Sequence, residues 1–137
     1  MNNYKKLIIY TDGGARGNPG PAGIGVVVFN ADESEIISQH KQYIGETTNN
    51  QAEYKAIISG LQEAKKLKAQ EVEIYTDSEL VCSQINGIYK IKNTDFQDSF
   101  IKIYNLKQSF KKIKFKHILR EKNKLADKLV NQAIDQK

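Results

Sequence analysis

Cysteine is nearly absent from this chain of 137 residues, and long apolar runs are missing altogether. The single cysteine, Cys82, excludes an internal disulfide and a zinc site built from cysteines. No apolar stretch approaches the ~20 residues of a membrane-spanning helix, and the apolar run at residues 7–10 is too short for the core of a signal peptide. We therefore expect a cytoplasmic protein that has no contact with membranes.

Repeats, linkers and low-complexity tracts are also missing. The length suits one domain with one hydrophobic core, and 39% hydrophobic and 27% charged residues are ordinary values for a globular protein. We expect residues 1–137 to form a single domain. Nothing in the sequence indicates an obligate protein partner, so we also expect a monomer.

The positive charge is concentrated in one segment. The formal net charge is +5, and residues 107–124 contain eight lysines or arginines against one acid, Glu121. A basic segment attracts phosphate groups and makes binding dependent on salt. A solvated lysine-rich surface has the same composition, so charge alone leaves both interpretations open.

The hydrophobic pattern predicts an α/β protein. Short connections between the first three strands indicate an antiparallel meander, and helices between the later strands indicate parallel pairing. We expect a five-stranded mixed sheet flanked by helices, with a glycine- and proline-rich turn at residues 13–23. The expected strands are 5–11, 24–29, 35–44, 72–76 and 113–119, and the expected helices are 50–67, 78–85, 95–109 and 125–134. The last helix should bury Leu125, Leu129, Val130 and Ala133, and Ile101 belongs to the apolar pattern of the third.

Two predicted strands end in the same way, with Tyr-Thr-Asp. Asp12 follows the first strand and Asp77 follows the fourth. If these strands are parallel neighbours, both aspartates lie at the carboxyl edge of the sheet, where open α/β sheets bind ligands. Adjacent carboxylates repel each other unless a cation lies between them, and oxygen ligands suit Mg²⁺. Each aspartate could equally cap a turn or a helix.

Two further acids lie near the starts of predicted helices. Glu53 follows the polar run 47–51, and Asp127 lies early in the last helix. Considered alone, each could simply complement the helix dipole.

Four segments of the chain, in this order, resemble the signature blocks of the type 1 ribonuclease H family. They are TDGGARGNPGPAGIG, TTNNQAEYKAI, YTDS and REKNKLAD, and the resemblance extends from about residue 7 to residue 133. The short tail and the last block look most like the compact bacterial and archaeal branch. The resemblance implies a ribonuclease H-like fold and an endonuclease that hydrolyses the RNA strand of RNA–DNA hybrids, leaving 5′-phosphate and 3′-hydroxyl ends.

The resemblance also implies which residues do the chemistry. It implies two Mg²⁺ ions, for which Mn²⁺ can substitute, that would activate the attacking water and stabilise the leaving 3′-oxygen. Asp12 is the expected bridge between the two ions. The catalytic and metal-binding carboxylates that the resemblance implies are Asp12, Glu53, Asp77 and Asp127.

Polar residues beside these acids acquire substrate-binding roles by the same resemblance. Asn18, Asn49 and Asn50 match positions that contact ribose 2′-hydroxyls, which distinguish RNA from DNA. Thr48 matches a phosphate-binding position on the DNA strand. From the residues alone, Asn18 would be a turn residue and Asn49 a helix cap.

Two features depart from the family pattern. Many members carry a histidine in the loop before the last aspartate, where this chain has Arg120 in the segment 120–124. Arg120 could bind phosphate, but an arginine cannot shuttle protons near neutral pH. The segment 86–95 is too short for the basic protrusion that grips the hybrid in many members, so Arg16 and the segment 107–124 are the expected phosphate contacts.

Two alternative functions remain open at the level of sequence. A nuclease of the same fold could also cut double-stranded RNA, and a non-catalytic module could bind nucleic acid only. The four acids argue against the non-catalytic module, because a negative cluster facing phosphates weakens simple binding.

Overall fold

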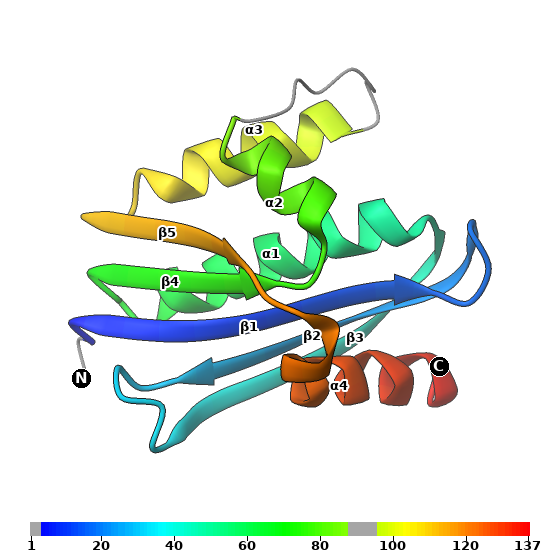
Figure 1. Cartoon of the computed structure of the whole chain (residues 1–137), viewed down its shortest axis with the longest axis horizontal. Helices are drawn as coiled ribbons and strands as arrows, with labels where there is room; N and C mark the ends of the chain where they lie inside the picture. The colour runs from blue at the N-terminus through cyan, green and yellow to red at the C-terminus, as the bar shows by residue number, and fades with distance from the viewer. Residues whose placement is uncertain (1–3, 88–95) are drawn as a thin grey trace.

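The computed structural model describes residues 4–87 and 96–137, which form a five-stranded mixed sheet with helices on both faces (Figure 1). The strand order is β3-β2-β1-β4-β5, with the first three strands antiparallel and the last two parallel to β1. The α/β fold expected from the sequence is therefore confirmed. The strands are β1 (Lys6–Ala15), β2 (Gly20–Phe29), β3 (Ile36–Thr47), β4 (Glu71–Thr76) and β5 (Lys112–His117).

Helices α1 and α4 lie on opposite faces of the sheet, as Figure 1 shows. Side chains on adjacent strand residues point to opposite faces, and a Cβ on Gly13 would point at α1 whereas one on Gly14 would point at α4. None of the helices in the two described stretches is long and apolar enough to cross a bilayer. The helices are α1 (Asn49–Lys66), α2 (Glu79–Ile85), α3 (Gln97–Lys107) and α4 (Lys124–Asp135), with the 3₁₀ helix η2 (Arg120–Lys122) before α4.

The main hydrophobic core lies between the sheet and α1. Ile57 and Leu61 of α1 are fully buried, and so are Leu7 and Ile9 of β1. Alternate residues of a strand share a face, so Leu7 and Ile9 point into this core. Ile8, which lies between them, is buried as well but is not part of this core, because the opposite face of β1 is also covered. Cys82 of α2 is also buried in this core, and burial raises its pKa.

The glycine-rich segment is not the long turn that the sequence predicted. Strand β1 continues through Asp12 to Ala15, where it pairs with Ala22 of β2. Only residues 16–19 form the connection, with Gly17 at a φ of 100° and a cis peptide bond between Asn18 and Pro19. The prediction that the first strand ends at Asp12 is therefore wrong.

The glycines of these two strands allow the helices to approach the backbone. A Cβ on Gly13 would lie 2.2 Å from the carbonyl carbon of Ala52 in α1, and one on Gly25 would lie 2.3 Å from the carbonyl oxygen of Ala126 in α4. Such distances are far inside van der Waals contact, so no other residue fits without a shift of the helix. Glycine in this segment serves helix packing, as it often does inside strands.

Two apolar side chains expected inside the protein lie outside it. Leu125 is 49% exposed and Ile101 is 55% exposed. In α4 the small Ala126 faces the sheet in place of Leu125, because the close contact with Gly25 sets the rotation of the helix. The buried residues of α4 are Ala126, Leu129, Val130, Ala133 and Ile134.

Candidate active site

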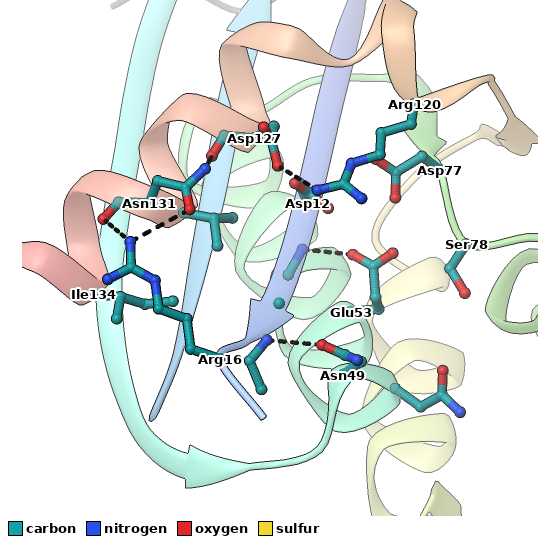
Figure 2. A pocket seen from close by; sticks show the side chains of 15 residues that line it. Asp12, Arg16, Asn49, Glu53, Asp77, Ser78, Arg120, Asp127, Asn131 and Ile134 are labelled. Atoms are coloured by element: carbon teal, nitrogen blue, oxygen red, sulfur yellow. Dashed lines mark hydrogen bonds and ion pairs between the residues drawn. The ribbon is translucent and has the colours of Figure 1, made fainter. Parts of the chain in front are cut away.

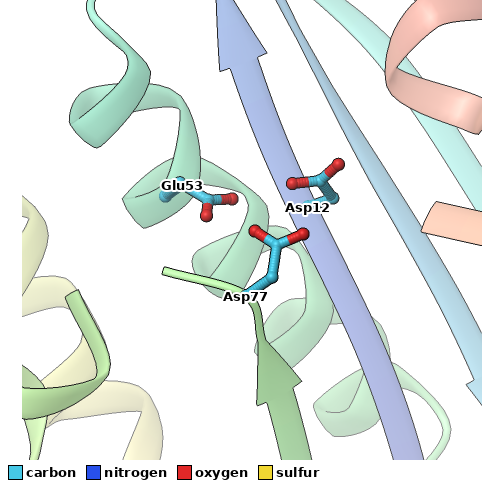
Figure 3. Close-up of side chains that lie close together, drawn as sticks. All are labelled: Asp12, Glu53 and Asp77. Atoms are coloured by element: carbon cyan, nitrogen blue, oxygen red, sulfur yellow. The ribbon is translucent and has the colours of Figure 1, made fainter. Parts of the chain in front are cut away.

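Three carboxylates meet where β1 and β4 separate. The parallel pairing of the two strands ends at Tyr10 and Tyr75, so Asp12 and Asp77 follow side by side. Glu53 comes from the N-terminal part of α1 and points at both, as Figure 3 shows. One carboxylate oxygen from each of the three lies within 4.8 Å of the others. The expectation that Asp12 and Asp77 are neighbours is confirmed.

Each of the three acids is held by a different part of the fold. Asp12 lies inside β1, opposite Gly25 of β2, and is 6% exposed. Glu53 is 5% exposed, and its carboxylate accepts a hydrogen bond from the backbone N–H of Gly13. Asp77 lies just beyond the end of β4, where it is half-buried. The three positions are therefore fixed by backbone as well as by side-chain contacts.

Burial and mutual repulsion make this cluster unfavourable in its fully ionised form. Burial, with the negative charges of Asp77 and Asp127, raises the pKa of Asp12 to about 8. Burial, with the charges of Asp12 and Asp77, also raises the pKa of Glu53. A divalent cation would relieve this repulsion, and carboxylate oxygens are the ligands that hard cations prefer. The cluster is therefore a fitting metal site.

The fourth acid, Asp127, lies in the first turn of α4 and lines the same pocket of about 530 Å³. Its Oδ1 atom is 3.6 Å from Nη2 of Arg120, an ion pair visible in Figure 2. Asp127 is not one of the three acids whose oxygens lie together. The structure thus brings all four predicted acids to one pocket but leaves Asp127 paired with Arg120.

Two of the predicted asparagines, Asn49 and Asn50, line this pocket, and Asn49 is hydrogen-bonded to Asn18. Asn49 accepts a hydrogen bond from the backbone N–H of Ala15 through its Oδ1 atom at 2.8 Å (Figure 2). The backbone N–H of Asn49 donates in turn to Oδ1 of Asn18 at 3.1 Å. These bonds tie the start of α1 to the turn between β1 and β2.

A second hollow adjoins the carboxylate pocket. Asn18 and Thr48 line it, and Asn50 lines both the hollow and the carboxylate pocket. Thr48 also caps α1, since its hydroxyl accepts a hydrogen bond from the backbone N–H of Gln51 at 3.2 Å. The residues predicted to bind substrate therefore lie in one continuous region beside the acids.

Some of the expected phosphate contacts have partners within the protein. Arg16 forms an ion pair with Asp135 at the end of α4, and Lys116 lies 3.6 Å from the carboxylate of Glu73 on the sheet. Arg120 is highly exposed beside the pocket. The segment 88–95, on which the missing protrusion depends, lies outside the described residues.

Asn123, which sequence reasoning did not single out, connects the acids to the strands. It is 1% exposed, and its Nδ2 atom donates to the carbonyl oxygen of Thr11 at 2.8 Å and to Oδ2 of Asp77 at 3.3 Å. Asparagine directly before a helix ordinarily acts as its N-cap, and Asn123 directly precedes α4. No pattern in the sequence showed that its side chain turns toward the strands instead.

Comparisons with known proteins agree with this geometry. Residues 10–133 match the family described as "Reverse transcriptase-like". The bifunctional protein Rv2228c of Mycobacterium tuberculosis is 44% identical over 130 residues, which are 95% of this chain and 36% of that protein. The ribonuclease HI of Halobacterium salinarum is 36% identical over 92% of this chain and 63% of its own length. The chain therefore spans about a third of the mycobacterial relative and less than two thirds of the archaeal one.

Solved structures of similar proteins share the whole fold. The N-terminal RNase H domain of Rv2228c, solved as a fusion with maltose-binding protein, has a TM-score of 0.92 and 44% identity, covering 95% of this chain and 99% of that one. RNase H1 of Halobacterium salinarum has a TM-score of 0.93 at 35% identity, covering 96% and 99%. LC11-RNase H1, in complex with an RNA/DNA hybrid, has a TM-score of 0.88 at 49% identity, covering 95% and 97%. With this coverage and identity, and with an acidic cluster at the edge of the sheet, the chain belongs to the type 1 ribonuclease H family, in its compact form.

Proposed function

We propose that the protein is an endonuclease that hydrolyses the RNA strand of RNA–DNA hybrids and leaves 5′-phosphate and 3′-hydroxyl ends. The observation that carries the proposal is the cluster of Asp12, Glu53 and Asp77 beside a polar hollow. Membership of the family supports the reaction, and the hybrid bound to LC11-RNase H1 supports the class of substrate. We also propose that the chain acts as a monomeric unit in the cytoplasm.

The four acids would hold two Mg²⁺ ions, for which Mn²⁺ would substitute. When bound, such ions supply Lewis-acid activation of the attacking water and of the leaving oxygen. Asp12 would contribute to holding both, because its carboxylate lies close to those of Glu53 and Asp77 and interacts with that of Asp127 as well. Gly13 keeps the Glu53 carboxylate in place through its N–H, and Arg120 must share or release Asp127 for that acid to act as a ligand.

The hollow beside the acids would select the RNA strand. Asn18, Asn49 and Asn50 are the proposed contacts to ribose 2′-hydroxyls, because an amide can both donate to and accept from a hydroxyl. Thr48 would contact a phosphate of the DNA strand. Arg120, exposed at the mouth of the carboxylate pocket, would bind phosphate near the cleavage site.

A cleavage assay with three labelled substrates tests this function. The protein is incubated with an RNA–DNA hybrid, duplex RNA and duplex DNA, with Mg²⁺ or with EDTA. We expect cleavage of the RNA strand of the hybrid only, and only with Mg²⁺. Cleavage of duplex RNA would show broader specificity, whereas hybrid binding without cleavage would show a binding module.

The salt dependence of hybrid binding tests the proposed interface. Arg16 is paired with Asp135 and Lys116 with Glu73, so these two cations are less available to phosphates than the other basic residues of the segment 107–124. We expect weak binding with a slope equivalent to roughly two to four phosphate contacts, and one cut per encounter. A steep slope with several cuts per encounter would indicate another binding surface.

A further inference from the structure

Asn123 occupies the position before α4 without capping the helix. Its backbone has a φ of −116° and a ψ of 32°, and its side chain makes no hydrogen bond to the first turn of the helix. Asparagine at this position ordinarily accepts an N–H of that turn and stabilises the helix. Here the side chain points into the protein, where it is almost wholly buried.

The two hydrogen bonds of the Asn123 amide fix its orientation. Nδ2 donates to the carbonyl oxygen of Thr11 and to Oδ2 of Asp77. Both partners accept only, so the NH₂ group must face them. The Oδ1 atom points away, and within the described residues it is buried with no hydrogen-bond partner. Leaving a buried oxygen unpaired is unfavourable, so the Asn123 side chain makes these two hydrogen bonds at a cost in stability from its unpaired Oδ1 atom.

The backbone of Asn123 extends the same connection to the remaining site residues. Its carbonyl oxygen accepts from the N–H of Asp127 at 3.0 Å, and its own N–H donates to the carbonyl oxygen of Arg120 at 2.9 Å. Thr11 immediately precedes Asp12 in β1. One buried residue therefore contacts Asp77, the strand at Asp12, and the turns that carry Asp127 and Arg120.

We propose that Asn123 is a positioning residue of the carboxylate site, which holds Asp77 and the first turn of α4 in fixed relation to Asp12. This rests on the proposed function in one respect, namely that these acids are metal ligands. Hydrogen bonds to ligating carboxylates orient them, and loss of such a partner typically weakens metal affinity or activity about 10- to 100-fold. Asn123 itself touches neither the ions nor the substrate in this account.

Asn123→Ala tests the proposal, with Asn86→Ala as a matched control. Asn86 follows α2 and likewise donates its Nδ2 to a backbone carbonyl, that of Phe115 in β5, at 3.1 Å. In the described residues it makes no contact with the four acids. For each protein, thermal melts are recorded over a range of Mg²⁺ concentrations, and kcat, KM and the Mg²⁺ dependence of hybrid cleavage are measured.

We expect Asn123→Ala to raise the Mg²⁺ concentration for half of the metal-induced change in Tm by about 10-fold. The kcat should fall about 10-fold or more, with KM for the hybrid within about 2-fold of wild type. Asn86→Ala should lower Tm in EDTA but leave the Mg²⁺ dependence and kcat unchanged. If Asn123→Ala does not fold, Asn123→Ser takes its place, since a hydroxyl can donate to only one of the two acceptors.

An Asn123 variant that loses Tm in EDTA but keeps the wild-type Mg²⁺ dependence and kcat would overturn the proposal, because the residue would then be purely structural. An equal shift in Mg²⁺ dependence for Asn86→Ala would overturn it as well. If the wild-type protein is stabilised by Mg²⁺ but cuts no hybrid, the proposed function is contradicted but the proposal for Asn123 is not. The thermal comparison of the variants would still decide the role of Asn123.

Discussion

Residues 10–13 and 75–78 have almost the same sequence, Tyr-Thr-Asp-Gly and Tyr-Thr-Asp-Ser, and begin as paired positions of two parallel strands. Beyond this pair their structures differ. Strand β1 continues to Ala15, so Asp12 lies inside a strand and is buried. Strand β4 ends at Thr76, so Asp77 lies in a turn, half-buried, before α2.

The difference arises from the neighbours on the far side of each strand. Strand β2 stays paired with β1 from Asp12 to Ala15, whereas β5 stops at His117, which pairs with Thr76 of β4. Pairing with a neighbouring strand therefore decides whether the tripeptide Tyr-Thr-Asp lies within a strand or at its end. The fourth residue differs accordingly: Gly13 lies inside a strand against α1, whereas Ser78 caps α2.

The largest expected effect is on catalysis. Asp12→Asn and Asp77→Asn should each reduce kcat on a hybrid by more than about 100-fold, beyond the loss typical of outer-shell partners, because each removes a ligand oxygen from the cluster. Asp127→Asn should retain more activity, since Asp127 lies outside the group of three and pairs with Arg120. Steady-state kinetics of variants with native circular dichroism check this. Substantial activity in folded Asp12→Asn, or cleavage in EDTA, would contradict the metal-dependent mechanism.

Substitutions of the fourth residue in the two segments should lower the free energy of unfolding by different amounts. Gly13→Ala would place a Cβ 2.2 Å from backbone atoms of α1, so we expect a loss of about 3 kcal/mol in the free energy of unfolding. Ser78→Ala removes the cap of α2, where the hydroxyl accepts from the N–H of Val81, and should lose about 1 kcal/mol. Urea denaturation measures both.

Gly14→Ala is the matched control for the Gly13 variant. Its Cβ would lie 3.6 Å from Cγ1 of Val130, an ordinary contact. We expect its stability to stay within about 0.5 kcal/mol of wild type. Equal losses for the two glycine variants would show that close packing against α1 is not the cause.

Burial of Asp12 should make the metal-free protein less stable as pH rises. The pKa of Asp12 is about 8 in the folded protein, above its ordinary value of 3.8, so the folded state holds this proton more tightly than the unfolded state. The penalty is absent below about pH 4, grows up to about pH 8 and is constant above it. Asp12→Asn should therefore be more stable than wild type in EDTA at pH 8, by a few kcal/mol.

Thermal melts between pH 4 and pH 8 test this pH dependence. Asp77→Asn should gain less than Asp12→Asn, because it removes one of the charges that raise the pKa of Asp12 but leaves Asp12 buried. Mg²⁺ should reverse the order of wild type and Asp12→Asn, since a bound cation relieves the repulsion that the substitution removes. A difference in Tm between wild type and Asp12→Asn in EDTA that stays constant from pH 4 to pH 8 would refute the role assigned to Asp12.

The smallest effect concerns the first residues of the two segments. The rings of Tyr10 and Tyr75 stack with centroids 4.9 Å apart and planes at 15°. A double-mutant cycle with Tyr10→Leu and Tyr75→Leu should give a coupling of about 0.5–1.5 kcal/mol. Tyr10→Phe is the control, because it removes only the hydroxyl that donates to Glu33. Strictly additive losses would show that the stacking contributes nothing.

Features determined by neighbouring residues in the chain, such as the starts of helices, could be predicted from the sequence. The helices expected from residues 50 and 78 begin at Asn49 and Glu79, within one residue of the prediction. Asn49 was expected to cap the first of them, but the hydroxyl of Thr48 caps it instead. The adjacency of Asp12 and Asp77 followed from parallel pairing. Asp127 could be assigned to the site only through the resemblance to the family, because its own segment shows nothing but an acid near a helix start.

Features that depend on contacts distant in the chain could not be predicted. Glycine is a turn signal in most sequences, but Gly13 and Gly25 are glycines because helices from residues 49–66 and 124–135 pass close to them. The same contact turns Leu125 outward. The orientation of Asn123 depends on Thr11, more than a hundred residues earlier in the chain.

The close approach of both helices to the central strands has a consequence for genetics. Gly13 and Gly25 have no side chain that could take part in the reaction, but we expect their substitution to displace the helices that carry Glu53 and Asp127. A saturation mutagenesis screen scored by activity would therefore find these two glycines as intolerant as the acids. The same screen scored by abundance would separate them, because the glycine variants would be depleted whereas folded variants of Asp12 would stay abundant.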